Sequence, residues 1–178
     1  MAQIDTGNMT QEQKEKNVII MYIAMAAANI IYFIVCELIL KYGFNPGQHG
    51  FAPQKLETYS MIKTVLIMLS IVETVFLAGI KLAVSSGNAS GIAKVFLNNL
   101  MKPTADDMAM VMIVTLNITS FCLSIGIYGV LIFMLNGIIA DTYIFFILCE
   151  VIILMFIPSK TYIEKLINLR KNMQQMGS

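Results

Sequence analysis

The stretch Cys36-Glu37-Leu38-Ile39-Leu40-Lys41-Tyr42-Gly43 decides the expected fold, because a variant of it returns as Cys122-Leu123-Ser124-Ile125-Gly126-Ile127-Tyr128-Gly129. Both copies place a cysteine, an isoleucine, a tyrosine and a glycine at the same spacing, at an offset of 86 residues. A second echo follows each copy, Glu57-Thr58-Tyr59 and Asp141-Thr142-Tyr143, at an offset of 84 residues. Matches in the same order at nearly one offset indicate an internal duplication. The alternative is chance similarity between apolar helices that draw on a restricted set of residues.

Composition indicates an integral membrane protein. Of the 178 residues, 57% are hydrophobic and 13% are charged, whereas a soluble domain carries roughly 25% charged residues. The apolar residues also come in runs long enough to cross a hydrocarbon core about 30 Å thick. A net charge of +1 leaves no broad basic surface, so nucleic acid is not an expected partner. The expected partner is the lipid bilayer.

Four membrane-spanning helices are expected, which makes the fold class an all-α polytopic membrane protein. The first helix begins at the capping box Thr10-Gln11-Glu12-Gln13, and the third begins at Thr104, whose hydroxyl can cap a helix. With the duplication, residues 1–178 form one membrane domain of two parallel hairpins, with repeat 1 over residues 17–85 and repeat 2 over residues 104–169. The apolar parts of the four spans are Val18–Val35, Thr58–Val84, Thr104–Leu135 and Asp141–Ile157.

Two further segments are amphipathic. Residues 90–101 place apolar side chains at helical spacing, which predicts a short interfacial helix lying on the membrane. The alternative for this segment is a loop helix tucked against the bundle. The tail from Ser159 combines an apolar side with lysine and arginine side chains, a pattern typical of a segment that lies on an anionic leaflet.

Lysine and arginine are unevenly divided between the two sides of this arrangement. Nine fall in the N-terminal segment, the middle connection and the tail, and three fall on the other side: Lys41, Lys55 and Lys63. The positive-inside rule therefore places both termini and the middle connection in the cytoplasm. The first and third helices then run the same way, as do the second and fourth, so a pseudo-twofold axis along the membrane normal relates the repeats.

Glu73 and Glu150 are the two carboxyls expected at mid-membrane depth. An ionised group in hydrocarbon costs several kcal/mol, so each carboxyl needs a reason to be there. Burial favours the protonated form near neutral pH. Such a group can carry a proton or a cation, and both residues are candidates for that role. The alternative is a protonated glutamic acid bonded to a neighbouring helix, with Asn29 or Asn117 as its partner.

The remaining polar side chains inside the spans predict helix contacts rather than chemistry. Asn29, Asn117 and Ser120 are candidates for interhelical hydrogen bonds. The sequence has no nucleophile with a base beside it, no phosphate loop and no metal-ligand spacing, so no catalytic residue, cofactor or metal site is predicted. Cys36, Cys122 and Cys149 lie in apolar runs and are expected to be small packing residues.

The second half of the chain resembles a known family. The residues that carry the resemblance are Cys122-Leu123-Ser124-Ile125-Gly126-Ile127-Tyr128-Gly129-Val130-Leu131-Ile132-Phe133, then Asn136-Gly137, Asp141-Thr142-Tyr143-Ile144-Phe145-Phe146 and Ile157-Pro158. They resemble an uncharacterised family of small bacterial four-helix membrane proteins, over roughly residues 95–167. They are also faintly similar to the duplicated hairpin of rotary ATPase proteolipid subunits. The resemblance implies a fold and a bacterial inner membrane location, and it implies no activity.

Together these patterns predict a non-enzymatic membrane subunit that assembles with itself, as a homo-oligomer, or with other membrane proteins. The alternative is a proton- or cation-translocating subunit of the proteolipid type that uses a mid-membrane carboxyl. A third class, a small transporter, gathers convergent polar groups near broken helices, whereas these spans are nearly unbroken.

Overall fold

The computed structural model of the protein describes residues 10–42, 56–101, 106–136 and 139–175. Within these ranges the chain is helical and contains no strand, so the predicted all-α class is confirmed there. The helices are α1 (Gln11–Lys41), α2 (Leu56–Ser86), α3 (Gly91–Met101), α4 (Asp107–Asn136), α5 (Ile139–Met155) and α6 (Lys160–Gln175).

The starts of α1 and α4 show how local sequence sets the helix ends. At α1 the predicted capping box is present, because the Thr10 hydroxyl accepts from the Gln13 amide and the Gln13 side chain accepts from the Thr10 amide. At α4 the Asp106 carboxylate accepts from the Met108 amide at 2.9 Å. The predicted cap Thr104 lies outside the described residues.

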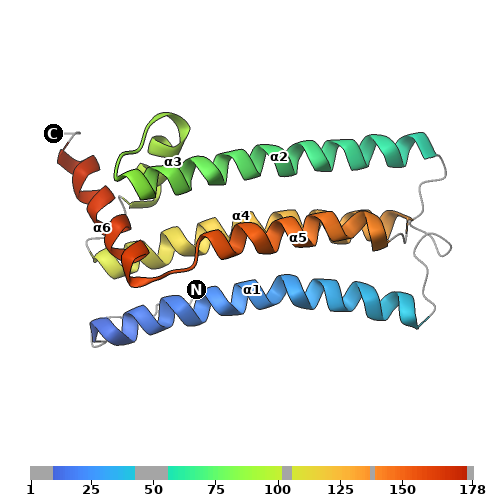
Figure 1. Cartoon of the computed structure of the whole chain (residues 1–178), viewed down its shortest axis with the longest axis horizontal. Coiled ribbons are helices and arrows are strands. Elements are labelled where there is room, and N and C mark those ends of the chain that lie inside the picture. The colour runs from blue at the N-terminus through green and yellow to red at the C-terminus, as the bar shows by residue number, and fades with distance from the viewer. Residues whose placement is uncertain (1–9, 43–55, 102–105, 137–138, 176–178) are drawn as a thin grey trace.

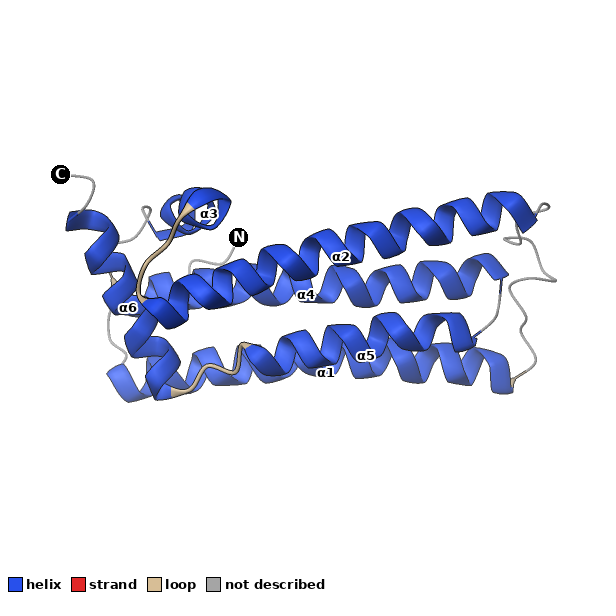
Figure 2. Ribbon diagram, turned by 45° about the horizontal axis from the view of Figure 1, so that its top comes forward, coloured by secondary structure: helices blue, strands red, loops and turns tan. Residues whose placement is uncertain are grey.

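The long helices lie side by side, with α4 and α5 in the middle (Figure 1). Helices α4 and α5 pack antiparallel along the length of the shorter helix, α5. Helix α1 packs along α4 and α5, and α2 packs mainly on α4 from the opposite side (Figures 1 and 2). In the described residues α1 and α2 make no contact with each other. The second half of the chain therefore separates the two helices of the first half.

This packing keeps only part of the symmetry that a duplication would give. If α1 corresponds to α4 and α2 to α5, the α2–α4 interface corresponds to the α5–α1 interface, and both are formed. The α4–α5 interface would correspond to an α1–α2 interface, which is missing among the described residues. The predicted arrangement of two equivalent hairpins is therefore not confirmed.

Two short helices gather at one end of the bundle. Helix α6 turns by 74° from the direction of α5 and buries Tyr162, Ile163 and Leu166 where it packs on α2 and α4. Helix α3 packs on α2, α4 and α6, with Leu97 and Met101 buried. Helix α3 thus packs on the bundle through Leu97 and Met101, while Ile92 and Val95 are 77% and 62% exposed, so it combines features of both alternatives expected for residues 90–101. The apolar stripe of α6 is buried on the ends of α2 and α4, and its predicted position on a leaflet stays a prediction.

Within the described ranges, three helices are long and apolar enough to cross a membrane: residues Gln11–Lys41, Thr58–Ser86 and Asp107–Leu135. A fourth span results if the bent pair α5 and α6 counts as one broken span. Their length and composition suit a helical membrane protein, since 30 residues of helix measure about 45 Å and a hydrocarbon core about 30 Å.

Candidate functional site

Two glycines let α4 approach its neighbours closely. At Gly126 an added Cβ atom would collide with the amide oxygen of Asn29 on α1. At Gly129 an added Cβ would lie 3.1 Å from the Cβ atom of Phe145 on α5. Small residues at helix interfaces permit such close packing inside membranes. In the second copy of the repeated stretch, Gly126 and Gly129 therefore lie on the side of α4 that faces α1 and α5.

Asn29 lies at the junction of α1, α4 and α5 and is 1% exposed. Its Nδ2 donates to Glu150 Oε1 at 3.0 Å and to the Phe146 carbonyl at 3.2 Å, both on α5. Its Oδ1 is buried beside Gly126, and no described residue donates a hydrogen bond to it. The position of Asn29 is thus set by its two bonds to α5 and by the space that Gly126 leaves.

Glu150 faces a groove of about 350 Å³ between α1 and α5. The carboxyl is half-buried, and Asn29 also lines the groove. The other lining side chains are apolar or aromatic: Ile30, Phe33, Tyr143, Phe146, Ile147, Val151 and Leu154. This groove opens to the outside of the bundle, and the surface that it exposes there is apolar.

Glu73 of α2 is held by two hydroxyl groups of α4. Its Oε2 lies 2.8 Å from Ser124 Oγ, and its Oε1 accepts from Tyr128 Oη at 2.7 Å. Ser124 Oγ also lies 2.6 Å from the Phe121 carbonyl. The two hydroxyls therefore tie Glu73 of α2 to α4.

The two glutamates occupy interfaces that the duplication would make equivalent. Glu73 connects α2 to α4, and Glu150 connects α5 to α1. In each case the carboxyl comes from the second helix of a repeat and its partner from a first helix. Their partners differ in kind, hydroxyls for Glu73 and an amide for Glu150. The structure thus places both predicted carboxyls at helix interfaces, and it does not bring them into one site.

Asn117 and Ser120, predicted for interhelical contacts, bond within their own helix. Asn117 Nδ2 donates to the Ile113 carbonyl and Ser120 Oγ to the Leu116 carbonyl, each at 2.8 Å. Only Asn29 of the three makes a described hydrogen bond to another helix. The physical reason is that a polar side chain on a helix can reach the carbonyl one turn back without a partner.

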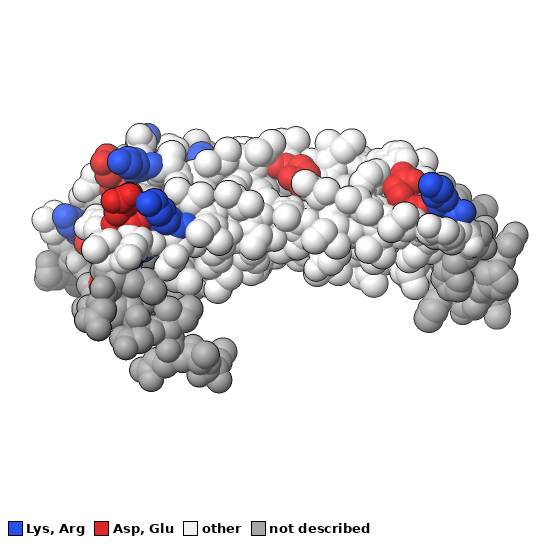
Figure 3. Space-filling model, turned by 90° about the horizontal axis from the view of Figure 1, so that it is seen from below, with Lys and Arg blue, Asp and Glu red and all other residues white. Residues whose placement is uncertain are grey.

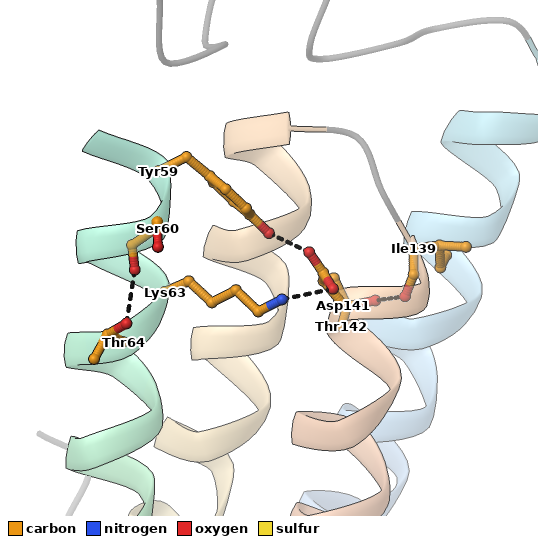
Figure 4. Close-up of polar contacts among 7 residues, drawn as sticks. All are labelled: Tyr59, Ser60, Lys63, Thr64, Ile139, Asp141 and Thr142. Atoms are coloured by element: carbon orange, nitrogen blue, oxygen red, sulfur yellow. Dashed lines mark hydrogen bonds and ion pairs between the residues drawn. The ribbon is translucent and has the colours of Figure 1, made fainter. Parts of the chain in front are cut away.

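An Asp141 cluster at the far end of the bundle was not predicted as a site (Figure 4). The Asp141 carboxylate accepts from Tyr59 Oη at 2.5 Å and from Lys63 Nζ at 2.7 Å, so it ties α5 to α2. Tyr59 and Asp141 were visible in the sequence as members of the two echoed triplets. The triplets are one repeat apart along the chain, and the structure joins one to the other.

At the opposite end, charged side chains connect the start of α1 and helix α6 to the start of α4. Lys14 Nζ lies 2.6 Å from Asp106 Oδ2, and Arg170 lies 2.9 Å from Asp107 Oδ1. The hydrogen bond from Lys14 is the main cause that lowers the pKa of Asp106 below its ordinary value, and the Met108 amide adds to the shift. On the face drawn in Figure 3, lysine and arginine gather toward the two ends, and an acidic patch lies between them.

Lys81 stabilises the point where α5 ends and the chain turns into α6. Its ammonium donates to the Met155 carbonyl and lies 5.4 Å and 5.3 Å from the ring centroids of Phe156 and Tyr162. A cation beside the last carbonyls of a helix is favoured by the helix dipole. Lys81 therefore supports the 74° bend from a third helix, α2.

Among the described residues no group of three or more histidine, cysteine or acidic side chains could hold a metal ion. The three cysteines are free and buried, and Cys149 Sγ donates to the Cys122 carbonyl at 3.0 Å.

Comparison of the chain with protein-family models, with curated proteins and with solved structures finds no match. Function is therefore inferred from the geometry of the helices themselves.

Proposed function

We propose that the chain is a non-enzymatic integral membrane subunit that assembles with itself or with other membrane proteins. One observation carries this proposal: Glu150 is half-buried in an otherwise apolar groove on the outer side of the α1–α5 pair. Polar groups inside membranes face protein or a water-filled cavity, because hydrocarbon cannot satisfy them. A partner helix that covers the groove would remove Glu150 from lipid and fill the space between α1 and α5.

The proposed orientation places both termini in the cytoplasm of a bacterial cell, with the protein in the inner membrane. It rests on nine lysine and arginine residues on one side against three on the other. Figure 1 supports it, since the start of α1, the end of α2, helix α3 and helix α6 lie together at one end. A reporter fused within residues 43–55 that proves active in the cytoplasm would contradict this orientation.

Assembly is tested with a pair of matched variants on α5. Ile147 lines the groove and is 64% exposed, whereas Ile144 is 61% exposed and does not line it. We expect Ile147→Trp to fill the groove and reduce the assembled fraction of the purified full-length protein, measured by native mass spectrometry or light scattering. Ile144→Trp, one turn away, should leave the assembly intact. A wild-type protein that stays monomeric, or two variants with the same effect, would contradict the proposal.

A second candidate function is proton or cation translocation of the proteolipid type. It is favoured by the position of Glu150 in the lining of the groove and by the hydroxyl groups around Glu73, because a carrier carboxyl needs polar neighbours that can exchange a proton with it. Hydrophobic carbodiimides label protonated carboxyls in apolar surroundings. In this case Glu150 should be labelled in a pH-dependent manner, and Glu150→Gln should abolish both the labelling and proton flux into liposomes. If the variant leaves flux unchanged, Glu150 is not a carrier; if flux is never observed while assembly fails, Glu150 is an assembly contact.

A further inference from the structure

A second, larger groove lies between α2 and α3, with a volume of about 860 Å³. One wall is a stripe along α2 at helical spacing, from Val72 through Gly79 to Ala83. The other wall and the end are formed by the connection after Ser86 and by the first residues of α3. Gly79 makes room in the floor, since a Cβ atom added there would meet nothing within 4 Å. This groove is separate from the Glu150 groove and contains no carboxyl among its lining residues.

The groove changes in polarity along its length. From Val72 to Ala83 the α2 wall of the groove is apolar. The rise along the helix axis between these two residues is about 16 Å. One leaflet of hydrocarbon, half of a core about 30 Å thick, measures about 15 Å. Beyond Ala83 the lining residues include Ser86, Asn88 and Ser90. The apolar wall therefore has the depth of a single leaflet, and the polar rim lies where the head groups of that leaflet would be.

The ends of the groove decide which kind of molecule fits it. A partner transmembrane helix crosses both leaflets and needs a surface that continues along the whole of α2. This groove instead begins near the middle of α2, at Val72, and its polar end is lined by Ser86, Asn88 and residues 90–93. The exposed apolar surface of α2 continues past Val72 to Met68 and Val65, where α3 no longer provides a second wall. Figures 1 and 2 show α3 beside the last turns of α2, where it would obstruct a helix that continued outward. A lipid has the complementary shape, because its chains end near mid-membrane and its head group stays at the surface.

We propose that the α2–α3 groove is a binding site for a glycerophospholipid of the leaflet on the α3 side. One acyl chain lies along Val72, Val75, Phe76 and Gly79, and the polar head of the lipid lies at Ser86, Asn88 and Ser90. This inference rests on the membrane location of the chain and is independent of assembly through the α1–α5 groove.

A matched pair of leucine substitutions tests the site. Gly79→Leu places a side chain in the groove, and Ala24→Leu adds a similar side chain to an exposed position of α1 outside it. The full-length protein is purified in detergent, mixed with phosphatidylglycerol or phosphatidylethanolamine, and examined by native mass spectrometry. We expect Gly79→Leu to weaken lipid retention about tenfold, which corresponds to ~1.4 kcal/mol, and Ala24→Leu to behave as wild type. Equal lipid retention by wild type and Gly79→Leu would overturn the proposal.

A second measurement uses the unaltered protein, so it holds even if Gly79→Leu fails to fold. Phospholipids with a photoreactive group at the end of an acyl chain, or near the head group, are incorporated into vesicles with the wild-type chain. We expect the chain-end probe to label the Val72–Phe76 region and the head-group probe to label residues 86–92. Labelling spread evenly over the exposed faces of α1 and α2 would overturn the proposal. So would an absence of labelling in the groove because a second protein chain covers it. Loss of assembly in Ile147→Trp without loss of this labelling would separate the two proposals.

Discussion

Gly126→Ala probes the centre of the α1–α4–α5 junction. The added methyl group would occupy the position of the Asn29 amide oxygen, so the Asn29 side chain must move. The movement breaks the Asn29 bonds to Glu150 and to the Phe146 carbonyl. Interhelical hydrogen bonds in membranes contribute about 0.6 kcal/mol each, so their loss costs ~1.2 kcal/mol. Overpacking increases the loss of stability by roughly 1–3 kcal/mol. The better helix propensity of alanine offsets about 0.5–1 kcal/mol of that loss.

The expected net loss of stability for Gly126→Ala is therefore about 1–3 kcal/mol, with the bond and propensity contributions nearly cancelling and overpacking remaining. Gly79→Ala is the matched control, because no atom lies within 4 Å of its added methyl group, and helix propensity alone predicts a gain of up to about 1 kcal/mol. Unfolding in mixed micelles, followed by circular dichroism, measures both variants. In an Asn29→Ala background the cost of Gly126→Ala should shrink, since the obstructing amide is gone. Equal effects of the two glycine variants, or an unchanged cost in that background, would refute the reasoning.

Three further predictions concern the other polar contacts. Glu73→Ala should cost about 1–2 kcal/mol in the same unfolding assay, because it leaves the Ser124 and Tyr128 hydroxyls without their partner on α2. Glu73→Gln keeps an acceptor for one of the two hydroxyls and should cost less, so equal costs would contradict this role of the side chain. Asp141→Asn should cost about 0.5–1 kcal/mol in the same unfolding assay, because it removes the ion pair with the part-exposed Lys63, and an unchanged midpoint would count against a role for this pair. The lowered pKa of Asp106 means that its bond to Lys14 stabilises the fold above the ordinary pKa of 3.8 and that this stability is lost as the pH falls below that value. Because the Asp106 side chain is 39% exposed, the difference between wild type and Asp106→Asn should be at most about 1 kcal/mol at pH 7 and should shrink as the pH falls below 3.8.

Sequence reasoning identified the helices because their signals are local. The apolar runs and the capping box at Thr10 depend on residues within one or two turns, so α1 and its start are where the sequence predicts them. The pairing of helices depends on which surfaces fit, and apolar residues surround most of each helix. The separation of α1 from α2 could not be predicted for that reason.

In the candidate site, too, local features could be predicted from the sequence and the pairing of side chains between helices could not. Glu73 and Glu150 were identified because a carboxyl stands out within an apolar run, and Asn29 was named as one possible partner. The assignment of Ser124 and Tyr128 to Glu73 requires the rotation of α4 about its axis, which the sequence does not specify. Asp141 was missed because an acidic residue at the end of a span is expected at the membrane surface, where a partner is not required.

The separation of α1 from α2 also bears on the order in which the chain can assemble during its synthesis. A ribosome delivers α1 and α2 to the membrane first, yet in the finished molecule these helices have no contact with each other in the described residues. Their packing partners, α4 and α5, are made later. Helices α1 and α2 can therefore reach their final packing only after α4 and α5 have been made. Until then their exposed surfaces are broadly apolar, with Ile20 and Ile23 on α1 and Met68 and Val72 on α2.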